Sequence, residues 1–133
     1  MGYRGWECAA VCIFLIVAVY WWSDVCWWRL AAERKGENFA TFRASFDADT
    51  SVELLRSVYA LCQSWTSVAD FPVLADDNLA EVYAREELDF DDAVLDLLKE
   101  FGRVPPPSED PPVVATVRDL VLFVTACPPA NPI

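Results

Sequence analysis

The sequence contains no histidine among its 133 residues. Histidine is the usual general base near neutral pH and the commonest metal-binding side chain in proteins. Its absence excludes Ser-His-Asp and Cys-His nucleophile arrangements, and with them the ordinary hydrolase chemistries. We therefore predict that the chain is not an enzyme.

Glycine and paired cysteines are also scarce. The four glycines are nowhere adjacent, so they cannot form the glycine-rich loop that holds a nucleotide phosphate. The five cysteines form no C-x-x-C pair, and their odd number argues against a disulfide framework and for a reducing compartment. Because paired cysteines and histidine are both missing, we predict no metal site and no cofactor.

Basic side chains are few, and they are unevenly placed. Residues 1–35 carry four basic and three acidic side chains, a net charge of +1, whereas residues 36–133 carry six and eighteen, a net charge of −12. Nucleic acid is excluded as a partner because its phosphates would be repelled. An acidic domain favours a basic protein surface instead.

The sequence has a single long apolar run, and it lies at the N-terminus. Residues 8–22, "CAAVCIFLIVAVYWW", are fifteen uncharged side chains, or about 22 Å of helix against a hydrocarbon core of about 30 Å. Extension to Trp28 gives about 31 Å and includes Ser23 and Asp24. Four tryptophans, Trp21, Trp22, Trp27 and Trp28, cluster at the C-terminal end of this segment, as in the aromatic belt of a membrane interface. We predict a single-pass transmembrane helix that binds the lipid bilayer through residues 8–28.

Two alternatives compete for this segment. A secretory signal peptide needs small residues at a cleavage site, but bulky residues, "YWWSDVCWW", follow the run. A buried core helix would have to hide four indoles in a small domain.

The orientation of the membrane helix is predicted from the flanking charges. The cations Arg29, Arg34 and Lys35 follow the span, and only Arg4 precedes it. This bias predicts a membrane location with the C-terminal domain in the cytoplasm.

Helix signals divide the rest of the chain. Residues 1–35 form the anchor and a juxtamembrane helix that Gly36 stops, residues 36–49 form a linker, and residues 50–126 form the acidic helical domain. The linker places Phe39, Phe42 and Phe46 on one helical face, more consistent with packing on the domain than with exposure. Residues 127–133 form a proline-rich tail.

Within the domain, capping residues mark the helices. Thr50 with Glu53, and Thr116 with Asp119, fit capping boxes that begin the first and last domain helices. Residues 67–78 are predicted to be a loop because of Pro72. Asp76 or Asp77 is expected to cap a short helix after it.

Two residues mark the ends of the acidic helix that follows. Asp91 is expected to cap it, and Gly102 to end it. Three prolines at 105–107 prevent the helix from continuing.

Two segments, "ADDNLAEVYAREELDFDDAVLDLLKEFG" and "TVRDLVLFV", resemble acyl carrier proteins. With the helix before them, the resemblance covers roughly residues 50–125 and implies an all-α bundle of three to four helices. In that family a serine at the start of the acidic helix carries a phosphopantetheine arm. Here Phe90 or Asp92, depending on register, occupies that position. Neither has a hydroxyl, so the carrier activity is not expected.

The acidic cluster is the candidate functional site. Between residues 76 and 96 nine carboxylates stand against one cation, Arg85. They could form a solvated face favoured by the helix dipole, a docking surface, or a calcium site, although "DFDDAVLDLLKE" lacks the glycine of an EF-hand turn. The predicted partner-binding residues are Glu86, Glu87, Asp89, Asp91, Asp92 and Asp96.

The sequence as a whole thus predicts a non-enzymatic, membrane-anchored adaptor that binds a basic protein surface through an acidic helix face. The alternative is a divergent acyl-carrier-like or lipid-metabolism accessory protein that uses a pocket between its helices.

Overall fold

The structure, a computed structural model, describes residues 3–85, 87–106 and 113–130, and its regular secondary structure there is α-helical. Its helices are α1 (Tyr3–Glu33), α2 (Phe39–Ala44), α3 (Val52–Ser64), α4 (Leu79–Tyr83), α5 (Glu87–Glu100) and α6 (Val117–Ala126). Within these residues there is no strand, only the isolated bridges Asn78–Thr116 and Arg103–Pro129. The all-α prediction is therefore confirmed for the described residues.

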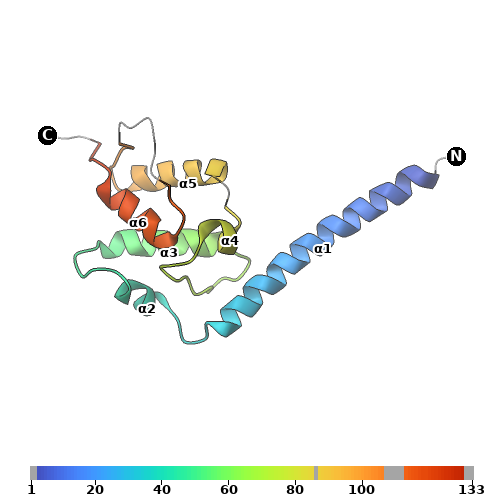
Figure 1. Cartoon of the computed structure of the whole chain (residues 1–133), viewed down its shortest axis with the longest axis horizontal. Coiled ribbons are helices and arrows are strands. Elements are labelled where there is room, and N and C mark those ends of the chain that lie inside the picture. The colour runs from blue at the N-terminus through green and yellow to red at the C-terminus, as the bar shows by residue number, and fades with distance from the viewer. Residues whose placement is uncertain (1–2, 86, 107–112, 131–133) are drawn as a thin grey trace.

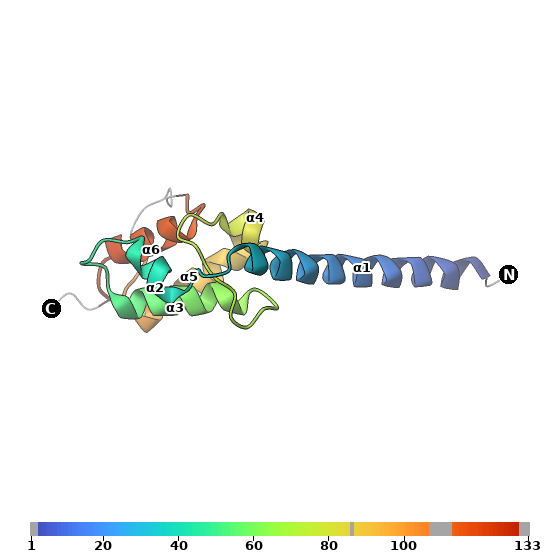
Figure 2. The same cartoon turned by 90° about the horizontal axis from the view of Figure 1, so that it is seen from below.

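The helices form a small bundle from which one long helix projects. α6 packs against both α3 and α5, while α2 packs on α3. α1 extends away from this bundle and approaches it only at its C-terminal end (Figures 1 and 2). The bundle and the projecting part of α1 are thus in different environments.

Capping side chains begin the helices of the bundle, partly as predicted. The box of Thr116 and Asp119 at α6 is confirmed. α3 begins instead at Ser51, whose hydroxyl accepts a hydrogen bond from the Leu54 amide. α4 is capped by Asn78 and not by an aspartate. α5 begins at Glu87, so Asp91 lies inside the helix, and its predicted capping role is wrong.

Glycine ends two of the helices. Gly36 follows α1 with a φ of +102°, and Gly102 follows α5 with a φ of +63°. Glycine adopts this left-handed backbone without the steric cost that a Cβ would add. Both predicted helix stops are confirmed.

The core includes residues outside the regular helices. Phe71 and Val73 are completely buried although they lie in the segment between α3 and α4. Phe42 of α2 is 1% exposed and contacts Tyr59 of α3, with ring centroids 5.1 Å apart. The packed unit therefore extends N-terminally of residue 50 and includes α2.

The prediction of a single-pass transmembrane helix through residues 8–28 is wrong. Among the residues that the structure describes, no helix has both the length and the apolar character that crossing a bilayer requires. The fifteen-residue uncharged run is too short alone, at about 22 Å. The residues that would extend it lead into the bundle, where Trp27, Leu30 and Ala31 pack on the core. The membrane location inferred from this segment is corrected with it.

Candidate functional site

A groove of about 560 Å³ lies between α3 and α5. Its apolar lining comes from α3, α5 and the turn after α3: Ala60, Leu61, Trp65, Ala93 and Leu97. Its polar lining consists of Ser57, Arg85, Asp96 and Glu100. Its volume falls within the range of about 300–1,000 Å³ that is typical of ligand sites, and its lining mixes polar and apolar side chains.

Charges of opposite sign mark the two ends of this groove. At one end the Ser57 hydroxyl donates a hydrogen bond to Glu100 Oε1 at 2.8 Å. At the other, the Arg85 guanidinium lies 4.9 Å from the centroid of the Trp65 ring. Ser57 and Trp65 are eight residues apart on α3 and its C-cap, so about 12 Å of helix rise separates the ends. The Arg85 Nε is buried and has no hydrogen-bond partner among the described residues.

The acidic face of α5 continues beyond the groove. Asp92, Asp96 and Glu100 follow at intervals of four residues, and all three are exposed. This spacing places them on one side of the helix. Asp96 and Glu100 line the groove, while Asp92 does not.

Part of the predicted site can be compared with this arrangement. Asp92 and Asp96 lie on the exposed face of α5, as predicted. Glu86 and the side chains of Glu87, Asp89 and Asp91 lie outside the described residues. Glu100 is absent from the predicted site, because the acidic cluster in the sequence is bounded at Asp96. The prediction also missed Ser57 and Trp65, which no motif in the sequence connects to α5.

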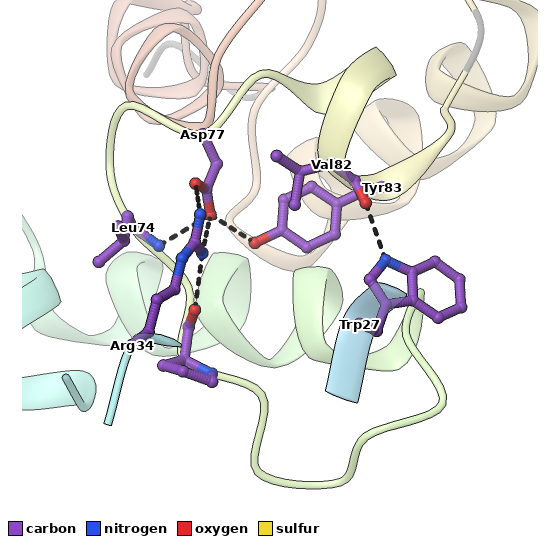
Figure 3. A network of polar contacts seen from close by, with 7 residues as sticks. Trp27, Arg34, Leu74, Asp77, Val82 and Tyr83 are labelled. Atoms are coloured by element: carbon purple, nitrogen blue, oxygen red, sulfur yellow. Dashed lines mark hydrogen bonds and ion pairs between the residues drawn. The ribbon is translucent and has the colours of Figure 1, made fainter. Parts of the chain in front are cut away.

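A second polar cluster centres on Asp77, which is 5% exposed (Figure 3). Arg34 Nη1 donates to Asp77 Oδ2 at 2.8 Å, and Nη2 donates to Oδ1. The Leu74 amide and the Tyr83 hydroxyl also donate to Oδ2, at 3.0 and 2.9 Å. Arg34 Nη1 donates to the Pro72 carbonyl as well, at 2.9 Å. Because all of these partners are internal, the cluster stabilises the fold.

The same region fixes the C-terminal end of α1 to the bundle. The Trp27 indole donates to the Val82 carbonyl of α4 at 2.8 Å (Figure 3). Arg34, just beyond α1, joins the Asp77 cluster. Together these contacts hold α1 against the segment that leads to α5, and so set its direction relative to the groove.

Burial changes the acidity of two groups near this cluster. Desolvation raises the pKa of the Cys62 thiol far above its ordinary value, and the nearby Asp77 charge adds to the effect. Desolvation likewise raises the pKa of the Tyr83 hydroxyl, with further contributions from Cys62 and from the bond to Asp77. Both groups are therefore neutral in the folded chain at physiological pH.

This neutrality predicts that alkaline pH destabilises the fold. Thiols and phenols ionise near pH 8.5 and 10 in an unfolded chain, and near those values the folded chain still holds its protons. The free energy of unfolding should therefore fall as pH rises above about 8.5, by roughly 2–3 kcal/mol at pH 10.5. Urea titrations at pH 7.5 and 10.5 measure this. The Cys62→Ala variant should lose most of the decrease; an equal decrease in that variant would contradict the assignment.

Metal-binding geometry is missing from the described residues, where no three carboxylate or thiol side chains gather as ligands. Comparison with known proteins gives no relative: no family model, no curated protein and no solved structure matches the chain.

Proposed function

We propose that this chain is a non-enzymatic protein-interaction module that binds a basic, amphipathic segment of a partner in the groove between α3 and α5. The observation that carries the proposal is the juxtaposition of the apolar groove with the carboxylates of Asp96 and Glu100. The resemblance to acyl carrier proteins is consistent with it, since an acidic helix serves there as a docking surface.

The charge of the groove favours a basic partner. Two carboxylates and one guanidinium line it, and residues 36–133 carry a net charge of −12. Such a field attracts cations at long range and accelerates their association. The lysines or arginines of a bound segment would pair with Asp96 and Glu100.

The apolar lining supplies the second half of the recognition. Leu97 is 4% exposed and forms part of the wall together with Leu61 and Trp65. Burying apolar surface of a partner against these side chains contributes roughly 25 cal/mol per Å². A basic peptide without apolar side chains should therefore bind weakly.

The opposite charges at the two ends of the groove favour one orientation of a bound peptide. A segment with a cation at the Glu100 end and an anion at the Arg85 end would satisfy both. A long acyl chain fits less well, because it would place methylenes against three charged groups that need water or a counter-charge. We therefore favour a peptide over the alternative of a lipid ligand.

Calorimetric titration with a synthetic peptide tests the proposal. The peptide carries leucines on one helical face, lysines at one end and a glutamate at the other. Replacing both Asp96→Asn and Glu100→Gln should raise its Kd about tenfold, because exposed ion pairs contribute about 0.2–1 kcal/mol each and the field of the groove weakens. Raising the salt from about 0.05 to 0.5 M should weaken wild-type binding similarly.

Asp92→Asn is the matched control. It removes one negative charge from the same face of α5, where the double variant removes two, but Asp92 does not line the groove. Its Kd should change less than about twofold. An equal loss in this variant would show that only the overall charge matters, and no loss in the double variant would refute the groove.

A further inference from the structure

The projecting part of α1 exposes an unusual amount of apolar surface. The consecutive residues Ile13 to Val17 are each between 56% and 71% exposed. Successive residues of a helix point about 100° apart, so five of them cover its whole circumference. Helices that are apolar all round are normally buried.

The exposed aromatic side chains of α1, taken around the whole helix, have an area in the range of an interface, and one of them, Trp22, lies on the stripe defined below. The aromatic side chains Trp6, Phe14, Trp21, Trp22 and Trp28 are each 61–71% exposed. At about 150–250 Å² per aromatic side chain, these five alone expose roughly 500–800 Å². The largest apolar patch of a typical monomer is about 300–600 Å², and a stable complex buries about 800 Å² per partner.

One stripe of α1 has the spacing of a helix–helix seam. Cys8, Cys12, Leu15, Trp22 and Cys26 recur at intervals of three, four or seven residues. All five are exposed, and none is charged. The stripe through Trp6, Ile13, Val17 and Trp28 has the same spacing but includes the sequence position of Asp24. A seam without charge is the better surface for close packing.

We propose that this stripe, Cys8 to Cys26, binds the same stripe of a second copy in antiparallel orientation. The partner of an uncharged apolar stripe must itself be apolar, and the same stripe of another copy has that chemistry. Each copy also carries a net charge of −12 beyond residue 35. A parallel pair would bring these two acidic bundles together at one end.

The antiparallel arrangement places the two bundles at opposite ends of the paired helices. The stripe spans eighteen residues, or about 27 Å, well beyond the Debye length of about 8 Å at physiological salt. Eighteen residues also make five full turns, so Cys8 and Cys26 lie on the same side of α1. When the midpoint of the antiparallel pair is level with residue 17 along the helix axis, Cys8 of one copy lies opposite Cys26 of the other.

Cross-linking of full-chain variants that keep one of the three α1 cysteines tests this. One version keeps Cys8 (Cys12→Ser with Cys26→Ser), and the other keeps Cys26 (Cys8→Ser with Cys12→Ser). The two remaining cysteines, Cys62 and Cys127, are 0% and 3% exposed, so they are protected from a short bismaleimide reagent. A mixture of the two versions should give a covalent dimer, and either version alone should give little.

Other outcomes overturn the proposal. A dimer from the Cys8 version alone would show parallel pairing. A monomer mass in analytical ultracentrifugation, with no cross-link in the mixture, would show that the stripe does not bind a second copy. A monomer that floats with phosphatidylcholine vesicles would show that lipid covers the stripe instead.

A matched pair of glutamate substitutions distinguishes the contribution of the stripe to dimerisation from that of the rest of α1. Leu15→Glu places a carboxylate in the proposed seam, whereas Ile13→Glu places one about 160° away around the helix. The wild-type side chains are similarly exposed, at 56% and 62%. Leu15→Glu should weaken dimerisation at least about tenfold by sedimentation, and Ile13→Glu much less. Equal effects would overturn the choice of stripe.

Discussion

Replacing Asp77 with alanine is expected to lower the free energy of unfolding by about 3–5 kcal/mol. The substitution leaves the Arg34 guanidinium, whose side chain is 12% exposed, without its bidentate partner. It also removes the acceptor for the Leu74 amide and the Tyr83 hydroxyl. A buried charge that loses its partner costs far more than the net contribution of the intact pair. Chemical denaturation followed by circular dichroism measures the change.

The neighbouring carboxylate provides the control. Asp76 pairs with Arg118 at 2.9 Å, but its side chain is 80% exposed. Asp76→Ala should therefore cost less than about 1 kcal/mol. The double variant Arg34→Ala with Asp77→Ala should cost clearly less than the sum of the two single variants, since no unpaired charge remains. Additive losses, or equal losses for Asp76 and Asp77, would contradict the role given to this cluster.

Phe71→Ala is expected to have a comparable effect, also about 3–5 kcal/mol. The Phe71 side chain is fully buried, lies 6.0 Å from the Tyr83 ring in an edge-on arrangement, and has the Arg34 guanidinium 5.5 Å from its centroid. Truncation leaves a cavity beneath the Asp77 cluster, and it removes both ring contacts. The same denaturation experiment measures the loss.

Leu122→Ala serves as the reference for this substitution. Leu122 belongs to α6 but is 57% exposed, so its removal should change stability by less than about 0.5 kcal/mol. A similarly small effect for Phe71 would mean that the segment between α3 and α4 is an ordinary surface loop and not a part of the core.

That segment illustrates what the sequence could predict and what it could not. Local signals predicted the helix stops at Gly36 and Gly102 and the start of α6 at Thr116, because capping depends on neighbours a few residues away. The same logic suggested that Pro72 marks a loop, which is correct for the backbone. It gave no sign that Phe71 enters the core, since burial depends on residues distant in the chain.

Long-range pairing also explains the errors at Asp77 and in α1. The sequence predicts Asp76 or Asp77 as a helix cap, but Asp77 pairs with an arginine 43 residues earlier. Asn78 caps the helix instead. A hydropathy pattern likewise cannot show that Trp27 donates a hydrogen bond to Val82, 55 residues away. The C-terminal end of α1 therefore belongs to the folded unit, and extending the apolar run through it as a membrane span was wrong.

The sequence predicted the charged face of the candidate site but not its apolar groove. Charge spacing identified the exposed face of α5 that carries Asp92 and Asp96. The groove beside it forms only when α3 packs alongside, bringing Ser57 within 2.8 Å of Glu100 across 43 residues of sequence. No single-sequence pattern encodes that contact, so the apolar half of the site emerged only from the fold.

Mapping the bound peptide by nuclear magnetic resonance tests the central claim most directly. Titration of the isotope-labelled chain with the lysine–leucine peptide should shift the amide signals of Ala60, Leu61, Asp96 and Leu97, which face the groove from both helices. The signals of α6, such as Leu122, should stay in place. Shifts confined to other surfaces, or no shifts at a peptide concentration that saturates the calorimetric signal, would contradict the groove as the binding site.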